Sequence, residues 1–244
     1  MNKLTAMVEG GKRLGHIKSL ISSKIKAGVT PREIDQVIDD LIVKGGDRPS
    51  FKMVPGYFNA TCINVNSGMV HGIPNDIPFK SGDVVKVDMG LFHNGYHLDS
   101  SLTIQVDPVD NKTTEFLKIG QLALSRAIVA ARPGNTIFDI SLAMQDTVEP
   151  AGYSVIRDLT GHGIGKELHM EPYIPCFADP HTKKNILHEN QTIAIEIMYA
   201  MGRPSLVEDS DGWTLSTQDG SVTGMFEETV YISQDGPIIL TQAN

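Results

Sequence analysis

Residues 84–99, VVKVDMGLFHNGYHLD, contain two strand-like runs separated by His93-Asn94-Gly95. Asn-Gly strongly favours a tight hairpin turn, because both residues tolerate positive φ. The stretch therefore predicts two antiparallel strands. Such a hairpin can bring the carboxylates of Asp88 and Asp99 to one cation, although an aspartate in such a place is more often a cap or a turn former.

A second run of the same kind lies about a hundred residues later, at Thr192-Ile193-Ala194-Ile195-Glu196. Both runs are rich in β-branched residues and end on a carboxylate. Because Ile197 and Met198 follow, Glu196 is expected to lie inside an apolar strand. A buried, unpaired carboxylate costs several kcal/mol, so Glu196 needs a cation or a proton.

The two acidic runs belong to a longer internal repeat. Thr30-Pro31-Arg32-Glu33 provides an N-cap, a proline at the first helical position and a capping-box glutamate for a helix that ends at Gly45-Gly46. A longer helix is expected before each copy, over roughly residues 5–27 and 112–132. Four residues recur 106 positions on: Gly28, Thr30, Ile34 and Gly46 as Gly134, Thr136, Ile140 and Gly152.

Each copy also carries a His-Gly-Ile sequence, at His71 and at His162, ahead of its acidic strand. The repeated order of helix, His-Gly-Ile and acidic strand predicts two related α+β halves, about 1–107 and 108–244. We expect them to form one catalytic domain, 1–244, in which the acidic strand ends face a shared site.

Further candidate ligands lie in the second half. Glu227 and Glu228 occupy a strand-like run, 225–232, where period-2 alternation allows only one of them to point inward. His162 lies between glycines in the loop-like sequence 160–165, where missing side chains allow close approach to the imidazole. A histidine in such a loop is more often a turn residue, but this one accompanies four acids on apolar strands.

Four carboxylates and one neutral imidazole carry four negative charges, which two divalent cations would balance. Structural zinc sites prefer thiolates and imidazoles, whereas oxygen-rich surroundings with one nitrogen suit Mn²⁺, Fe²⁺ or Co²⁺, with Zn²⁺ an alternative. Two such ions about 3.5–4 Å apart would hold a bridging hydroxide at neutral pH. The residues alone therefore predict a hydrolytic site.

Composition and charge limit the classes of binding partner and the cellular compartment that we expect. Because 21 Lys+Arg face 29 Asp+Glu and no basic run occurs, nucleic acid is not expected as a partner. Residues 1–5 lack the apolar region of a signal peptide, and no apolar stretch approaches the roughly 18 residues of a membrane span. We expect a cytoplasmic protein with no membrane partner. Cys62 and Cys176 lack CxxC spacing and are expected to be buried, small hydrophobic residues.

Together, these motifs resemble the type I methionine aminopeptidases. The resemblance covers nearly the whole chain, and the order and spacing of its pieces are specific. It implies an α+β pita-bread fold, with two pseudo-symmetric halves around a curved antiparallel sheet and helices on the outside. The stretches that carry it are Pro49–Phe51, Val70–Pro74, Gly95–Asp99, Gly161–Gly165 and Asp211–Thr217.

The resemblance also implies roles for individual residues. Glu196 would move a proton to the leaving amine, and His71 and His169 would contact the peptide and the tetrahedral intermediate. The five metal ligands would be Asp88, Asp99, His162, Glu196 and Glu227. The methionine side chain would lie against Tyr57, Cys62, Leu168 and Trp213, although Tyr57 and Trp213 could equally be core aromatics.

The implied reaction is hydrolysis of the N-terminal methionine from proteins and peptides with a small second residue, with two divalent ions (Co²⁺, Mn²⁺, Fe²⁺ or Zn²⁺) bridged by hydroxide. The partners would be the N-termini of nascent proteins, and we expect a monomer. One alternative is an Xaa-Pro aminopeptidase or prolidase, disfavoured by the short N-terminus and by Asp211-Gly212-Trp213-Thr214. Another is an inactive binding protein, disfavoured because all five ligands are present.

Three positions depart from the family pattern. Ile197 replaces the usual proline, Glu228 the usual histidine after the last ligand, and Leu168 the usual aromatic before His169. None of the three removes a ligand. Glu228 is expected to add a carboxylate close to the site, where it could alter metal preference.

Overall fold

The computed structural model describes residues 2–242. The helices are α1 (Lys3–Ser22), α2 (Pro31–Lys44), α3 (Asn111–Ala130) and α4 (Ile137–Val148), with short 3₁₀ turns η1 (Phe51–Met53), η2 (Glu149–Ala151) and η3 (Pro180–Lys184). The strands are β1 (Arg48–Pro49), β2 (Thr61–Val65), β3 (Gly68–Val70), β4 (Val84–His93), β5 (Tyr96–Gln105), β6 (Ser154–Val155), β7 (Thr160–Gly163), β8 (Met170–Pro175), β9 (Thr192–Ala200), β10 (Leu206–Glu208), β11 (Leu215–Thr217), β12 (Thr223–Ser233) and β13 (Gly236–Ile239).

The main sheet is antiparallel throughout and follows the order β1-β4-β5-β12-β9-β7-β8, with β2 also on β4, β6 on β9 and β13 on β12. The pairing of β5 with β12 joins strands from the two parts of the chain. A small second sheet, β10-β11-β3, links the loop after β9 to the first part. None of the helices within residues 2–242 combines the length and apolarity that crossing a membrane requires.

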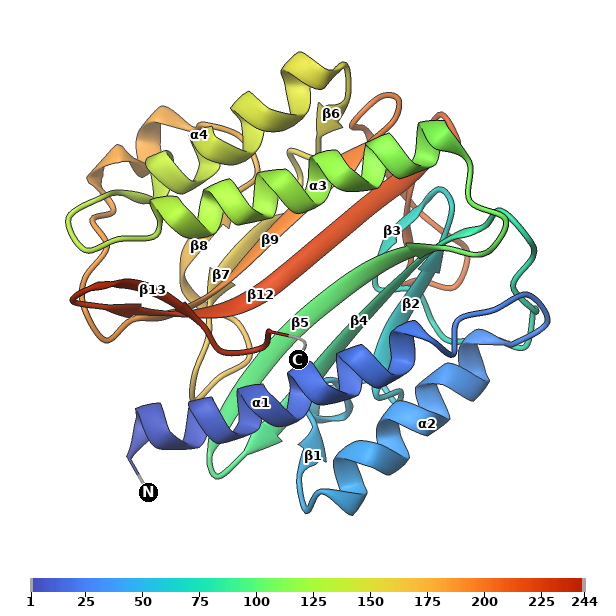
Figure 1. Cartoon of the computed structure of the whole chain (residues 1–244), viewed down its shortest axis with the longest axis horizontal. Coiled ribbons are helices and arrows are strands. Elements are labelled where there is room, and N and C mark those ends of the chain that lie inside the picture. The colour runs from blue at the N-terminus through green and yellow to red at the C-terminus, as the bar shows by residue number, and fades with distance from the viewer. Residues whose placement is uncertain (1, 243–244) are drawn as a thin grey trace.

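Two pairs of helices cover the sheet in equivalent places (Figure 1). In one pair, α1 packs on β4 and β5, and α2 lies beside it; in the other, α3 packs on β9 and β12 beside α4. The two pairs lie on either side of the β5–β12 junction. This arrangement confirms the predicted α+β fold, with helices outside a large antiparallel sheet.

Repeated local structure explains why the two helix pairs resemble each other. The Glu33 carboxylate accepts a hydrogen bond from the Thr30 N–H, and Asp139 does the same for Thr136, so α2 and α4 begin with the same cap. Glycines with positive φ flank both helices, at Gly28 and Gly46 around α2 and at Gly134 and Gly152 around α4. The boundary between residues 107 and 108 stays a prediction.

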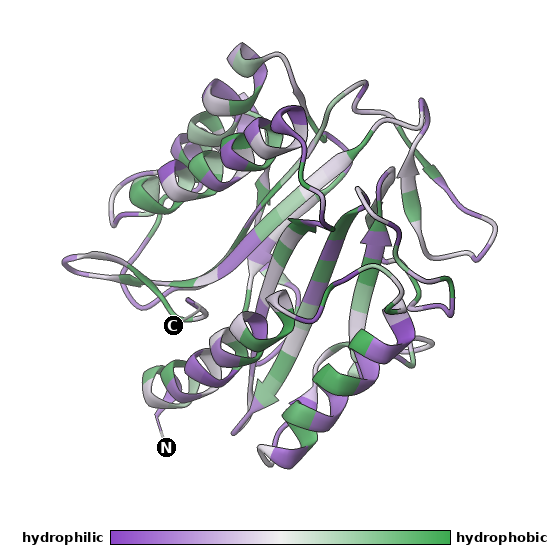
Figure 2. Cartoon of the chain, turned by 45° about the vertical axis from the view of Figure 1, so that its right-hand side comes forward, coloured by the Kyte–Doolittle hydropathy of each residue, from purple (hydrophilic) through white to green (hydrophobic). Residues whose placement is uncertain are grey.

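Each helix pair has its own hydrophobic core. One cluster, which includes Met7, Ile38 and Val87, fills the space between α1, α2 and the first strands. The other includes Phe116 and Tyr199 and lies under α3 and α4. In Figure 2 the helices mix hydrophilic and hydrophobic residues, as expected for amphipathic helices with one face on a sheet.

The structure corrects two predicted boundaries. The first helix ends at Ser22 rather than near residue 27. At this end the hydroxyls of Ser22 and Ser23 donate to the carbonyls of Ser19 and Leu20, and these bonds compete with continuation of the helix. The third helix ends at Ala130 rather than 132. The hairpin prediction holds, with Asn94 and Gly95 at φ 47° and 90° between β4 and β5.

Candidate metal centre and substrate pocket

The register of the sheet aligns acidic residues across four strands. Glu196 on β9 lies opposite Glu227 on β12, Glu227 lies opposite Ser101 on β5, and Ser101 lies opposite Asp88 on β4. Asp99, two residues before Ser101, is on the same face of β5 by strand alternation. The first acidic run was predicted to end on its carboxylate, but Asp88 lies in the middle of β4; Glu196 lies inside the apolar strand β9, as expected.

His162 lies on the short strand β7, opposite Ala194 of β9, and not in a loop as predicted. Its glycine neighbours serve strand packing, because a Cβ on Gly161 would approach the Ala194 carbonyl oxygen to 2.6 Å. The ring Nδ1 lies 2.9 Å from the Gly163 carbonyl oxygen, which can only accept, so Nδ1 carries the proton. The lone pair is therefore on Nε2, 4.0 Å from a Glu196 oxygen.

The candidate ligands form overlapping groups of three residues. Within each group, the ligand atoms lie within 4.8 Å of one another. Glu227 belongs to two of these groups, as does Asp99. The groups are Asp88 with Asp99 and Glu227, His162 with Glu196 and Glu227, and Asp99 with His162 and His169. Residues that belong to two groups are expected where two neighbouring ions share ligands.

Burial makes the four acids costly without a cation. It raises the pKa of Asp88 to about 7 and those of Asp99, Glu196 and Glu227 well above their ordinary values, with repulsion among the carboxylates adding to the last three. Within residues 2–242 no lysine or arginine forms an ion pair with them.

Two observations indicate that the protein does not itself neutralise the negative charge of the four carboxylates. Lys86 is fully buried two residues before Asp88, but its ammonium donates to the carbonyls of Asn66 and Thr223, at 2.9 and 3.2 Å. The Asp88 Oδ1 atom is buried without a hydrogen-bond partner. An acceptor-only oxygen in such a place fits a bound cation, so the residues present suit a divalent metal.

Two more histidines flank the acids. The ring of His169 lies 4.6 Å from that of His162 in an edge-on arrangement. Burial lowers the pKa of both His71 and His169, which favours neutral imidazoles that can each donate one N–H. His71 has φ 59°, a left-handed conformation that is costly for a residue with a Cβ and that often marks functional sites.

One pocket contains every residue predicted for the site, and its cavity volume is about 110 Å³. Tyr57 and Trp213 contact edge to face, with ring centroids 5.0 Å apart, and the Tyr57 hydroxyl donates to the Thr61 carbonyl at 2.7 Å. Cys62 and Leu168 are buried beside them, and Cys176 is buried as predicted. The lining residues are Phe51, Val54, Tyr57, Cys62, Val70, His71, Asp88, Asp99, His162, Leu168, His169, Glu196, Trp213 and Glu227.

Three apolar lining residues, Phe51, Val54 and Val70, were not predicted from the sequence. A signal was present for two of them, because Phe51 and Val70 belong to the stretches that carry the family resemblance. Val54 follows η1 and had no such signal. Its place in the pocket depends on how the loop after β1 folds.

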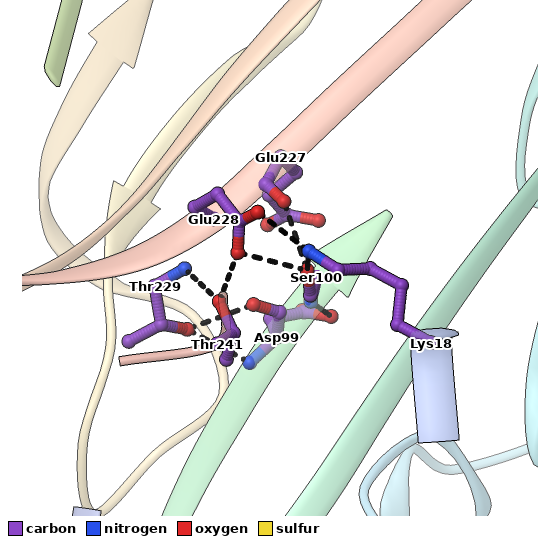
Figure 3. A network of polar contacts seen from close by, with 7 residues as sticks. All are labelled: Lys18, Asp99, Ser100, Glu227, Glu228, Thr229 and Thr241. Atoms are coloured by element: carbon purple, nitrogen blue, oxygen red, sulfur yellow. Dashed lines mark hydrogen bonds and ion pairs between the residues drawn. The ribbon is translucent and has the colours of Figure 1, made fainter. Parts of the chain in front are cut away.

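Glu228 was expected to add a carboxylate close to the site; it lies directly behind Glu227 but does not line the pocket. Its carboxylate bonds to Lys18 of α1, on the helix-covered face of the sheet (Figure 3). Alternation along β12 turns Glu227 into the pocket and Glu228 away from it, so the departure from the family pattern lies behind the site.

Comparison with known proteins agrees with this geometry. The model of metallopeptidase family M24 matches residues 6–234. Methionine aminopeptidase of Clostridium perfringens is 36% identical over 98% of this chain and 96% of that protein. The crystal structure of methionine aminopeptidase from Thermotoga maritima matches with a TM-score of 0.95 at 36% identity, over 98% of this chain and 96% of that one. Prolidase from Pyrococcus furiosus shares the fold, with a TM-score of 0.80 at 24% identity, and this chain covers 64% of it. The chain therefore belongs to metallopeptidase family M24, among its methionine aminopeptidases.

Proposed function

We propose that this protein is a metal-dependent aminopeptidase that removes the N-terminal methionine from proteins and peptides whose second residue is small. One observation carries the proposal: four carboxylates, three of them buried and Asp88 half-buried, share a single pocket with an apolar, partly aromatic lining, and no protein cation pairs with them within residues 2–242. The carboxylates call for metal, and the lining suits a thioether side chain.

We assign Asp88, Asp99 and Glu227 to one divalent ion and His162, Glu196 and Glu227 to a second, with Asp99 within reach of both. When bound, such ions supply Lewis-acid polarisation of the scissile carbonyl and make water a stronger acid. The oxygen-rich set with one imidazole favours Mn²⁺, Fe²⁺ or Co²⁺, with Zn²⁺ an alternative.

The protein groups then move protons and hold the peptide. Glu196, whose pKa is raised by burial, is suited to take a proton and deliver it to the leaving amine. His169 and His71, neutral because their pKa values are lowered, donate N–H groups to the peptide carbonyl and to the developing oxyanion.

The apolar side of the pocket receives the methionine side chain. Tyr57, Cys62, Leu168 and Trp213 line it together with Phe51, Val54 and Val70. The free amine of the substrate would lie beside Asp88 and Asp99, where negative charge attracts it. This placement favours cleavage after the first residue of a chain and not inside it.

We infer that the natural partners are the N-termini of nascent proteins in the cytoplasm. Because one chain supplies every residue of the pocket, catalysis requires no second subunit, and we expect a monomer.

The test is a set of peptides incubated with the metal-free protein and with the protein after addition of Mn²⁺ or Co²⁺. Met-Ala-Ser and Met-Gly-Ser should lose methionine, Met-Lys-Ser should react poorly, and N-acetylated Met-Ala-Ser should not react. Mass spectrometry measures the products.

The acetylated peptide is the matched control, because it keeps the side chain and removes only the charged amine. Cleavage before proline whatever the first residue would favour the prolidase alternative. Binding of peptide without any cleavage in the presence of metal would favour an inactive binding protein.

A further inference from the structure

A network of buried polar groups connects the helix-covered face of the sheet with two of the candidate ligands, Asp99 and Glu227 (Figure 3). We call Lys18, Ser100, Glu228, Thr229 and Thr241 the backing network. Lys18 comes from α1, Ser100 from β5, Glu228 and Thr229 from β12, and Thr241 from the segment after β13. The network therefore joins four parts of the chain.

At the centre is an ion pair between Lys18 and Glu228. The Lys18 ammonium lies 2.5 Å from the Glu228 Oε1 and donates to the Ser100 hydroxyl at 2.8 Å. The side chains of Lys18 and Glu228 are only 7% and 15% exposed, so solvent screens the pair weakly. Two buried charges are stable only when they lie close together and form hydrogen bonds. The pair therefore holds α1 against β5 and β12 in one arrangement.

Hydrogen bonds continue from this pair to the backbone of Glu227 and to the side chain of Asp99. The Ser100 hydroxyl donates to the Glu227 carbonyl at 2.9 Å, and the Ser100 N–H donates to the Asp99 carboxylate at 3.1 Å. On the other side, the Thr241 hydroxyl donates to Glu228 Oε2 at 2.5 Å and accepts from the Thr229 N–H at 3.0 Å.

Thr229 closes the connection between the two ligand strands. Its hydroxyl accepts from the Asp99 N–H at 3.0 Å and donates to the Asp99 carbonyl at 2.8 Å. Asp99 and Glu227 are thus linked twice across β5 and β12, through Ser100 and through Thr229. The network therefore contacts Asp99 and Glu227, each of which belongs to two of the candidate ligand groups.

The positive charge of Lys18 has a second role, because it neutralises Glu228. Glu228 follows Glu227 directly, and the pocket face of the same sheet already holds four carboxylates. Lys18 neutralises Glu228, so the backing network adds hydrogen bonds without a further net negative charge. Removal of either partner would leave the other as an unpaired buried charge next to the site.

We propose that Lys18 and Glu228 are positioning residues that hold Asp99 and Glu227 at the spacing needed for metal binding. The proposal rests on the metal site of the proposed function. Groups that orient metal ligands from behind typically change metal affinity or activity by 10- to 100-fold when they are removed. An ion pair that only stabilised the fold would lower the melting temperature and leave metal affinity unchanged.

The test compares Lys18→Met, Glu228→Gln and the conservative Lys18→Arg in the full chain. Arg13→Met is the matched control, because Arg13 is also on α1 and forms an ion pair, at 2.9 Å, with an Asp47 side chain only 3% exposed, away from the pocket. Calorimetry measures the Mn²⁺ dissociation constant of each metal-free protein, and initial rates on Met-Ala-Ser give kcat and KM.

Lys18→Met and Glu228→Gln should each weaken Mn²⁺ binding about tenfold and lower kcat to a similar extent, with KM within about twofold of the unaltered protein. Lys18→Arg should stay within about threefold on both measures, since it keeps the charge. Arg13→Met should lower the melting temperature and leave the Mn²⁺ dissociation constant unchanged. If Lys18→Met does not fold, Glu228→Gln and Lys18→Arg still give the comparison.

Unchanged Mn²⁺ affinity in Glu228→Gln would overturn the positioning role. So would affinities that move in opposite directions, tighter in Lys18→Met and weaker in Glu228→Gln, because that result would reflect charge alone. Failure of the unaltered protein to bind Mn²⁺ would instead overturn the proposed function, which keeps the two failures distinguishable.

Discussion

Glu227 and Glu228 are neighbours in sequence and lie on opposite faces of the same strand, where the protein treats their charges differently. Glu228, on the helix face, has a lysine and a threonine as partners. Glu227, on the pocket face, lies among three other carboxylates, and burial, together with repulsion from them, raises its pKa well above the ordinary range. One face supplies its own counter-charge and the other lacks it.

The functional face of this sheet differs from its other face in how buried charge is paired. Burial alone does not distinguish the two glutamates, because both have little exposed surface. The distinguishing feature is compensation: evolved structures pair buried charges, so acids left together without a cation indicate a ligand that supplies one.

Glu227→Gln should abolish most activity, whereas Glu228→Gln should lower it only about tenfold. A ligand shared by two ions contributes several kcal/mol of charge stabilisation, which corresponds to a loss on the order of a thousandfold in kcat/KM. Steady-state rates on Met-Ala-Ser at saturating Mn²⁺ measure both variants. Equal losses in the two variants would remove the distinction between the faces.

Glu196→Gln tests whether an acid on the pocket face also moves protons. The change keeps the shape of the side chain and removes its charge and basicity. We expect kcat to fall on the order of a hundredfold, with metal retained in part. Single-turnover rates and metal content, measured on the same preparation, separate the two effects. A kcat close to that of the unaltered protein would assign the proton transfer to another group, with His169 or His71 next.

Local features of the sequence predicted much of this molecule. The Asn94-Gly95 turn and the cap at Thr30 depend on a few adjacent residues, and each was predicted from those residues. The repeat spacing extended the prediction to two similar helix pairs. The candidate site followed from acids inside apolar strands, because such residues need a cation wherever the strands lie.

Contacts between distant residues were beyond local patterns. Alternation required that Glu227 and Glu228 face opposite ways, but only the strand register with β5 and β9 determines which one enters the pocket. Lys18 gave no signal at all, since its partner Glu228 is 210 positions away. The early end of α1 depends on serine hydroxyls that bond to their own helix, a competition that apolar periodicity does not register.

The stability of the metal-free protein should depend on pH in the opposite sense to that of a protein with paired acids. Because the folded pKa of Asp88 is raised to about 7, the folded state holds more protons than the unfolded chain from about pH 4 to pH 7. Stability therefore falls as pH rises through this window. A tenfold difference in proton affinity between the folded and unfolded states is worth about 1.4 kcal/mol, so the melting temperature should drop by about 3–5 °C or more between pH 5 and pH 7.5.

Thermal unfolding of chelated protein measures this fall, and added Mn²⁺ should reverse it at pH 7.5 by binding the ionised acids. A melting temperature that rises between pH 5 and pH 7.5 without metal would contradict the view that the pocket acids lack compensation.

The smallest expected effect concerns Leu168, at the apolar side of the pocket. Leu168 is buried and lines the same cavity as Cys62 and Trp213, immediately before His169. A ring at this position would allow a sulfur–aromatic contact, worth roughly 0.3–1.5 kcal/mol, that leucine cannot make. Leu168→Phe should therefore raise the preference for methionine over leucine at the first position by about two- to tenfold, without changing metal affinity. Competition between Met-Ala-Ser and Leu-Ala-Ser, with both enzymes at one Mn²⁺ concentration, gives the ratio of kcat/KM values. An unchanged ratio would mean that Leu168 lines the cavity without contacting the substrate side chain, and selectivity would then rest on Tyr57 and Trp213.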